Sequence, residues 1–435
     1  MITRMEPYTY DVPVNLVLFF KEMENKFYDA NLIYDAGTRA IKSSSFKYPT
    51  QLFEQNHLLE TAHIQRDMKS KKYKPKPGDK FPISERGKTR YISNNFVVDK
   101  AVNHLLCDEV LTPAVKPYLQ YDNMASQKNK GVDKYRERLE RHLHEYFNEY
   151  GTNEGYILTV DLSGYYANIP HDKCLEVCSL FLDKSKEDPE TIETAKWLIA
   201  LALESMEMDV SRFSDAEIRE MYNTKVDSMM NFFVDPALLT GEKWLKKGVD
   251  IGNQDSQDIG ILYPYRLDDY IKVVKGFHGW GRYTDDFYII SNDKIKLKFL
   301  LGEIKAIAKE YGLIINEKKT HILDLSKPFR HLQEQWWLTE TGKVVRKISS
   351  KSITRERRKL KAYRRLLDAD KITLDEVANS YKSWIGKHWK IMSWPQIYSM
   401  NQLYLELFNK PVTWKKGHGR LKFMMNHKPN KERMV

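Results

Sequence analysis

Apolar residues recur along the chain at two different spacings, which predict a mixture of helices and strands. Intervals of three and four residues predict helices at 51–68, 98–111, 134–147 and 189–208. Runs rich in β-branched and aromatic residues predict a strand at 156–160 and a strand pair around Gly87-Lys88. The chain therefore combines helices with hairpins.

One predicted hairpin carries adjacent acids at its tip. Residues 281–290 read Gly-Arg-Tyr-Thr-Asp-Asp-Phe-Tyr-Ile-Ile, so Asp285 and Asp286 stand at a tight bend between two apolar runs. Adjacent carboxylates repel each other, and divalent cations relieve that repulsion. Two Mg²⁺ ions about 3.5–4 Å apart are what in-line phosphoryl transfer needs. An exposed turn is the alternative, but Asp161, directly after the strand at 156–160, supplies a further acid and favours catalysis.

The charge of the chain favours a polyanionic partner. The formal net charge is +11, and residues 343–365 contain eleven Lys or Arg against one acid, Glu356. A solvated charged face is the alternative for this run. Only three cysteines occur, which excludes a disulfide framework and fits a reducing cytoplasm. The apolar run at 16–20 is too short to span a bilayer, so we expect no membrane partner.

Several motifs, in order along the chain, resemble those of reverse transcriptases. Tyr283-Thr284-Asp285-Asp286 is similar to the family's Tyr-x-Asp-Asp box, and Asp161 matches its first catalytic aspartate. Residues 81–92 resemble the fingers segment of bacterial members, and residues 312–320 resemble the motif whose lysine lies near the triphosphate. The resemblance implies an α+β fold, the right-hand polymerase fold, with fingers, a palm of antiparallel sheet plus helices, and a helical thumb.

The resemblance also implies a division of the chain. We expect a lead segment at 1–50, fingers at 51–150, and a palm at 151–332 with an insertion at about 184–247. A helical thumb at 333–410 and a basic C-terminal tail at 411–435 complete the expected order.

By the same resemblance, the catalytic and metal-binding residues can be named. Asp161, Asp285 and Asp286, with the backbone carbonyl of Leu162, would hold two Mg²⁺ ions, for which Mn²⁺ can substitute. Lys319 would protonate the departing pyrophosphate. Its neighbour Lys318 could take that role instead, and a solvated lysine pair is a further alternative.

Further residues are expected to bind the incoming dNTP. Arg90 and Lys88 would clamp the triphosphate, and Tyr166 would exclude a 2′-hydroxyl, unless it is only a packing residue. Residues 251–257 contain Ile251, Gly252 and Gln257, where most bacterial members carry Gln-Gly-x-x-x-Ser-Pro. This version of the motif resembles that of the enzymes of diversity-generating retroelements. By that resemblance, Gly252 would let the backbone approach the nucleotide.

In the basic run we expect five cations to hold nucleic-acid phosphates, with Arg355, Arg358 and Lys359 on one side of a helix. The five are Arg355, Arg357, Arg358, Lys359 and Lys361.

The sequence thus predicts an RNA-directed DNA polymerase that adds dNTPs to a 3′-hydroxyl and copies the RNA template of a bacterial or phage retroelement of the diversity-generating type. Expected partners are the RNA template, the nascent DNA and a small accessory protein, in a bacterial cytoplasm. One alternative is an antiphage defence reverse transcriptase that acts with an associated noncoding RNA. Another is a catalytically inactive RNA-binding scaffold.

Overall fold

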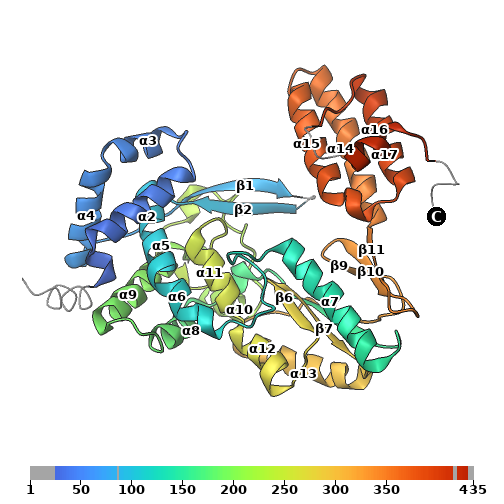
Figure 1. Cartoon of the computed structure of the whole chain (residues 1–435). Helices are drawn as coiled ribbons and strands as arrows, with labels where there is room; N and C mark the ends of the chain where they lie inside the picture. Colours follow the sequence, from blue (N-terminus) through green and yellow to red (C-terminus); the bar gives the residue numbers. More distant parts are fainter. Residues whose placement is uncertain (1–24, 86–87, 415–418, 430–435) are drawn as a thin grey trace, which may run out of the picture. The chain divides into compact units, whose positions relative to one another are not determined.

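The computed structural model describes residues 25–85, 88–414 and 419–429. The chain divides into two compact units (Figure 1). The first contains residues up to 139, 160–289 and 295–321, and the second contains 140–159, 290–294 and the residues from 322 onward. Helices and sheets occur in both units, which confirms the predicted α+β class.

The first unit begins with helices α2 (Ala30–Lys42), α3 (Tyr48–Gln55), α4 (His57–Lys69) and α5 (Val97–Leu106). The Asp29 side chain caps α2 by accepting hydrogen bonds from the N–H groups of Asn31 and Leu32. A Cβ atom on Gly37 of α2 would lie 2.3 Å from the His57 ring, so α2 and α4 approach closely. The helical structure predicted at 51–68 is confirmed, but it is divided into two helices because the chain turns at Asn56 between α3 and α4.

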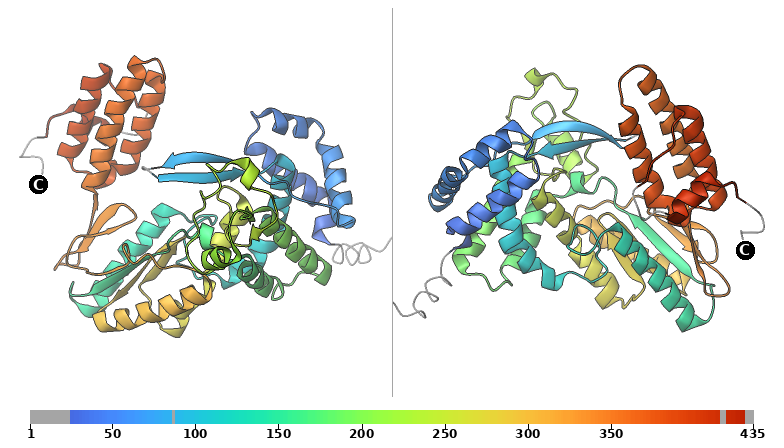
Figure 2. Two further views of the ribbon diagram at one scale, coloured as in Figure 1. Left: turned by 180° about the vertical axis from the view of Figure 1, so that it is seen from behind. Right: turned by 45° about the horizontal axis from the view of Figure 1, so that its top comes forward.

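A long hairpin lies between α4 and α5 in the chain. Strands β1 (Asp79–Glu85) and β2 (Lys88–Asn94) pair antiparallel, with Phe81 opposite Ile92 and Ile83 opposite Arg90. Figure 2 shows this ribbon projecting from the N-terminal helices. The strand pair predicted around Gly87-Lys88 is confirmed.

Four strands form the sheet that carries the acids, in the order β6-β7-β3-β8. They are β6 (Trp280–Tyr283), β7 (Asp286–Ser291), β3 (Tyr156–Asp161) and β8 (His321–Asp324). Phe287, Tyr288 and Ile289 on β7 and Ile157 and Leu158 on β3 are buried. The accompanying helices are α6 (Thr112–Val115), α7 (Val132–Tyr150), α8 (His171–Leu182), α11 (Gln254–Leu262), α12 (Tyr265–Asp269) and α13 (Lys294–Glu310).

The segment expected as an insertion contains α9 (Pro189–Ser205), β4 (Met208–Asp209), α10 (Asp215–Asn223) and β5 (Trp244–Leu245). Val210, Val226 and Leu245 form a small core of its own. The backbone N–H of Val226 donates to the Asn168 side chain at 2.9 Å. This bond joins the insertion to the segment that follows Asp161.

The second unit contains a three-stranded sheet and a helical bundle. The sheet has the order β11-β10-β9, and the bundle is built around buried residues such as Leu360, Tyr381 and Ile397. The elements are β9 (Phe329–His331), β10 (Glu334–Leu338), β11 (Val344–Ile348), α14 (Ser350–Asp368), α15 (Leu374–His388), α16 (Trp394–Phe408) and α17 (Gly419–Asn426).

Two expectations for this unit need correction. The region expected as helical from 333 onward begins with strands, and its helices start only at Ser350. The expected basic tail includes α17, whose Leu421 and Met425 are buried in the bundle core. Among the described residues, no helix is both long enough and apolar enough to cross a membrane.

Candidate active site

The hairpin of β6 and β7 turns through a two-residue loop. Tyr283 pairs with Asp286, which leaves Thr284 and Asp285 between the strands. Thr284 has a φ of 57°, in the left-handed region that a β-branched residue rarely adopts. The Asp285 carbonyl accepts a hydrogen bond from the N–H of Leu162 at 3.1 Å. The turn is thereby joined to the end of β3, where Asp161 stands.

Asp161 is buried, and both of its carboxylate oxygens have partners. One accepts a hydrogen bond from the Asn316 side chain at 2.7 Å, and the other forms an ion pair with Lys319. The Asn316 N–H also donates to the Asp161 carbonyl at 2.8 Å. Of the two candidate lysines, the structure therefore directs Lys319 at the acids.

Negative charge accumulates at the turn. Burial raises the pKa of Asp285, and the Asp161 charge raises it further, while Lys319 and Arg90 act in the opposite direction. Burial, with the charges of Asp285 and Asp161, raises the pKa of Asp286 to about 7. Three mutually repelling carboxylates form a hard oxygen donor set that suits a divalent cation such as Mg²⁺.

In this structure the three acids are not arranged as a preformed metal-binding site. In the parts of the chain that the structure describes, no three His, Cys, Asp or Glu side chains are grouped so that they could hold an ion. The Asp161 carboxylate is held by Lys319 and Asn316. The role of the Leu162 carbonyl stays a prediction.

Two predicted dNTP-binding residues lie near the acids. Arg90 is exposed on β2, and its charge lowers the pKa of Asp285. Tyr166 packs over Gly260 of α11 so closely that a Cβ atom there would lie 2.4 Å from its hydroxyl oxygen. Burial, followed by the Asp285 charge, raises the pKa of Tyr166 to about 12. Lys88 is the first residue of β2, but its side chain lies outside the described residues.

The segment before α11 lies against the β1–β2 hairpin. The Ile251 carbonyl accepts a hydrogen bond from the N–H of Ser93 on β2 at 2.8 Å. Gly252 has a φ of 127°, and a Cβ atom on it would lie 2.5 Å from the Ser93 carbonyl oxygen. The close approach that Gly252 permits in this structure is thus to β2. Gln257 is exposed on α11, and its contact with a nucleotide stays a prediction.

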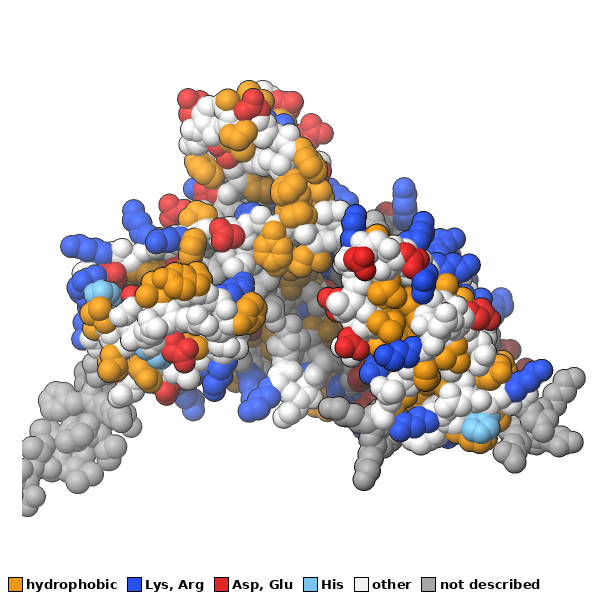
Figure 3. Space-filling model, turned by 90° about the horizontal axis from the view of Figure 1, so that it is seen from above, with side chains coloured by type: hydrophobic (Ala, Val, Ile, Leu, Met, Phe, Trp, Pro, Cys, Tyr) orange, Lys and Arg blue, Asp and Glu red, His pale blue; other side chains and the backbone are white. Residues whose placement is uncertain are grey.

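The five predicted phosphate-binding cations all lie on α14, in the second unit. Arg355, Arg357, Arg358 and Lys361 are exposed, and Arg357 also donates to the Ser399 hydroxyl at 3.1 Å. Arg355, Arg358 and Lys359 follow one another at helical spacing on α14, and Lys359 also donates to the Ser380 hydroxyl at 2.6 Å, so their joint contact with phosphates stays a prediction. Figure 3 shows Lys and Arg side chains gathered along one side of the bundle.

A buried arginine beneath the turn was not predicted. The Arg282 guanidinium is 1% exposed and donates to both carboxylate oxygens of Asp268 on α12, at 2.7 and 2.6 Å. It also donates to the carbonyl of Ile261 at 2.7 Å and to that of Thr284 at 3.1 Å. The sequence did contain a signal for Arg282, because it is a charged residue in an otherwise apolar strand next to the acids. Asn316 was missed as well, although it stands only three residues before Lys319.

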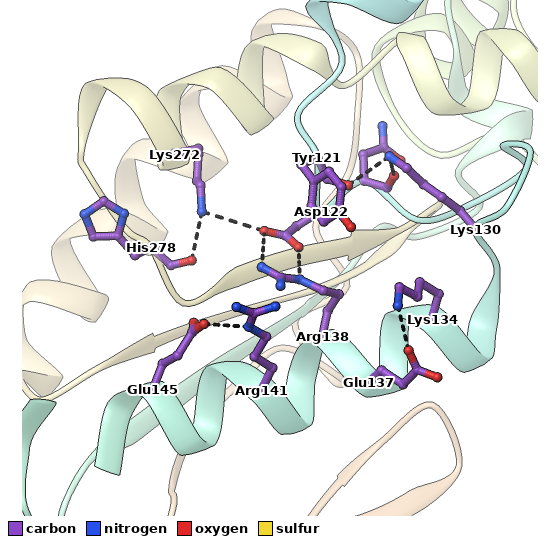
Figure 4. A network of polar contacts seen from close by, with 11 residues as sticks. Tyr121, Asp122, Lys130, Lys134, Glu137, Arg138, Arg141, Glu145, Lys272 and His278 are labelled. Atoms are coloured by element: carbon purple, nitrogen blue, oxygen red, sulfur yellow. Dashed lines mark hydrogen bonds and ion pairs between the residues drawn. The ribbon is translucent and has the colours of Figure 1, made fainter. Parts of the chain in front are cut away.

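A second polar network flanks β6 (Figure 4). Residues 122–124 run along the outer edge of β6, where the Arg282 N–H donates to the Asp122 carbonyl at 3.0 Å. Arg138 of α7 holds the buried Asp122 carboxylate with two nitrogens, and Lys272 lies 3.7 Å from it. The hairpin is therefore supported along its backbone as well as through the Arg282 side chain.

Comparisons with known proteins identify the family of this chain. The family model described as reverse transcriptase (RNA-dependent DNA polymerase) matches residues 74–335. No curated protein matches the chain. Among solved structures, telomerase from Candida albicans in complex with a fragment of telomeric RNA has 12% identity and a TM-score of 0.40, over 85% of this chain and 67% of that chain. Apo telomerase from Candida tropicalis, truncated from its C-terminal domain, has 15% identity and a TM-score of 0.38, over 61% of this chain and 54% of that chain.

Proposed function

We propose a mechanism and a biological role from the premise that this chain belongs to the reverse transcriptase family, and so is an RNA-directed DNA polymerase with the right-hand polymerase fold. Asp161, Asp285 and Asp286 hold two Mg²⁺ ions and direct dNTP addition to a 3′-hydroxyl. The observation that carries this proposal is the hydrogen bond between the Leu162 N–H and the Asp285 carbonyl, which brings the first aspartate to the acidic turn.

The bound metals would supply charge stabilisation for the attacking and leaving oxygens. The chain's own residues then bind and orient the reactants. Arg90 binds the triphosphate, since a guanidinium suits a bidentate grip on phosphate. Lys319, which pairs with Asp161 in this structure, would donate a proton from its ammonium group to the departing pyrophosphate. Tyr166 lies under the sugar and excludes a 2′-hydroxyl.

For the biological role we propose a bacterial or phage retroelement of the diversity-generating type. Ile251 and Gln257 support this assignment, since they replace the amide and the proline that most bacterial members carry. The template is an RNA, the product is its cDNA, and a small accessory protein assists. Sequencing of nucleic acid copurified with the intact protein tests the role. Template-repeat RNA is expected, whereas a structured noncoding RNA from a defence locus would contradict it.

The first prediction concerns catalysis. Asp285→Ala should abolish Mg²⁺-dependent dNTP incorporation on an RNA template, because it removes a ligand whose charge stabilisation is worth several kcal/mol in the transition state. Primer extension by the purified protein measures the effect. Asp183→Ala is the matched control, because Asp183 lies on the surface at the end of α8 and pairs with Lys196. Near-parental extension by Asp285→Ala would overturn the assignment of the metal site.

A further inference from the structure

The Arg282 guanidinium connects three parts of the first unit. Its four hydrogen bonds reach Asp268 on α12, the carbonyl of Ile261 near the end of α11, and the carbonyl of Thr284 in the acidic turn. The Ile261 carbonyl also accepts from the Asn123 side chain at 3.0 Å. A single planar side chain thus joins the turn to the helix that packs under Tyr166.

The backbone of the Thr284–Asp285 turn has an unfavourable conformation that the hydrogen bond from Arg282 stabilises. Thr284 holds a φ of 57°, which is unfavourable for a β-branched residue. Such a conformation persists only where its surroundings fix it, and Arg282 fixes the carbonyl of this same residue. The next residue is Asp285, whose carboxylate has to point toward a metal. A small change in the turn would therefore displace that carboxylate directly.

The Arg282 backbone has separate support, so the role of the side chain can be isolated. Residues 122–124 hold the backbone of Arg282 through the Asp122 carbonyl and the Met124 N–H, at 3.0 and 2.9 Å. The Asp122–Arg138 pair connects this edge of β6 to α7 (Figure 4). It is a largely buried ion pair between α7 and the segment that runs beside β6, and so is comparable to the Arg282–Asp268 pair.

We propose that Arg282 is a positioning residue for the metal site. It holds the Thr284–Asp285 turn in its left-handed conformation and sets the direction of the Asp285 carboxylate, while Asp268 fixes the guanidinium. The proposal rests on the proposed function, because it assigns Asp285 as a metal ligand. A merely structural ion pair, which joins α12 to β6 and leaves the metal site unaffected, is the competing explanation.

The test needs variants that still fold. Loss of the arginine alone would leave Asp268 buried without a partner, which is strongly destabilising. Arg282→Lys keeps the charge opposite Asp268, but a single ammonium group cannot reproduce the planar fork that reaches Asp268, Ile261 and Thr284 together. The pair Arg282→Met with Asp268→Asn removes both charges at once. The matched control is Arg138→Met with Asp122→Asn.

Mn²⁺ binding to the full chain, followed by electron paramagnetic resonance, reports the metal site without catalysis. We expect Arg282→Lys and the Arg282/Asp268 pair to raise the Mn²⁺ dissociation constant by about ten- to a hundred-fold, the usual effect of removing an outer support of a metal ligand. In primer extension, kcat should fall and the Mg²⁺ midpoint should rise by a similar factor, with the template-primer dissociation constant unchanged. The control pair should change the melting temperature but neither metal constant.

Other outcomes separate the two proposals. Folded Arg282 variants with parental Mn²⁺ binding and parental kcat would overturn the positioning role, and so would equal losses of metal binding in the control pair. If the parent binds Mn²⁺ equally well with and without Asp285→Ala, the proposed metal site itself fails, whatever the Arg282 variants do.

Discussion

At the scale of single residues, Tyr166 gives a direct test of sugar selection. Its ring packs over Gly260 beside Asp285, and under the proposed function it would meet a 2′-hydroxyl. Tyr166→Val should raise ribonucleotide incorporation relative to deoxynucleotide incorporation by about tenfold or more, because contacts of this size are worth about 1–3 kcal/mol in discrimination. Single-nucleotide extension with matched dNTP and rNTP pairs measures the ratio.

The neighbouring Tyr165 supplies the control. Its hydroxyl donates to the Gly260 carbonyl at 2.8 Å, away from the acids, so Tyr165→Phe should leave the ratio unchanged. An unchanged ratio in Tyr166→Val would identify Tyr166 as a packing residue.

A site residue could be predicted from the sequence when it lay in a short motif. It could not be predicted when its role depends on a contact with a residue far away in the sequence. Asp161, Asp285, Asp286 and Lys319 lie in short local motifs, and the structure brings them together. Arg282 acts on Asp268, 14 residues away, and Asn316 acts on Asp161, 155 residues away. Such pairings are set by tertiary packing, and no local pattern encodes them.

At the scale of the element, the β9–β11 sheet contains a buried histidine. Burial lowers the pKa of His331 to about 4, whereas an unfolded chain holds histidine near about 6.5. Between these values the unfolded state takes up a proton that the folded state does not, so the free energy of unfolding falls as the pH falls. At pH 5.5 this should cost about 1.4 kcal/mol, which His331→Gln should abolish.

Urea unfolding at pH 7.5 and 5.5 measures that difference, with Trp336 and Trp337 of β10 as local fluorophores. The control is His63→Gln, because the His63 side chain is 42% exposed. An equal pH dependence in the parent and in His331→Gln would contradict the prediction.

Among the elements, strands with a local turn signal could be predicted best. The β1–β2 and β6–β7 hairpins lie where alternation and turn residues placed them. The strands after 333 were mistaken for helix, although buried and partly exposed residues alternate along Glu334–Leu338. Their partners are β9 and β11, and the pairing that fixes them is not visible in a short window.

At the scale of the whole molecule, the excess of positive charge predicts that the affinity for the template-primer duplex falls as the salt concentration rises. Arg355, Arg358 and Arg365 are exposed on α14, and their joint replacement by Gln should weaken binding to unrelated sequences equally. Each lost phosphate contact should reduce the slope of log affinity against log salt by roughly 0.7–0.9. Binding titrations over a salt series measure the slope.

The control triple replaces Lys134, Arg141 and Lys173, which are already paired with acids on their own helices. This triple should change the slope much less. If the α14 triple keeps the parental affinity and slope, the basic run of α14 is only a solvated face.

The two-residue loop between β6 and β7 also limits how this enzyme can change in evolution. One added residue between Tyr283 and Asp286 would shift the register of the hairpin and turn alternate side chains to the opposite face of the sheet. Substitutions can therefore be tolerated at the turn, but length changes cannot. The exposed stretch at 227–243 within the 184–247 insertion can change length more freely, because it is a surface connection. Homologues should accordingly differ widely in length there and keep the spacing of the acidic turn constant.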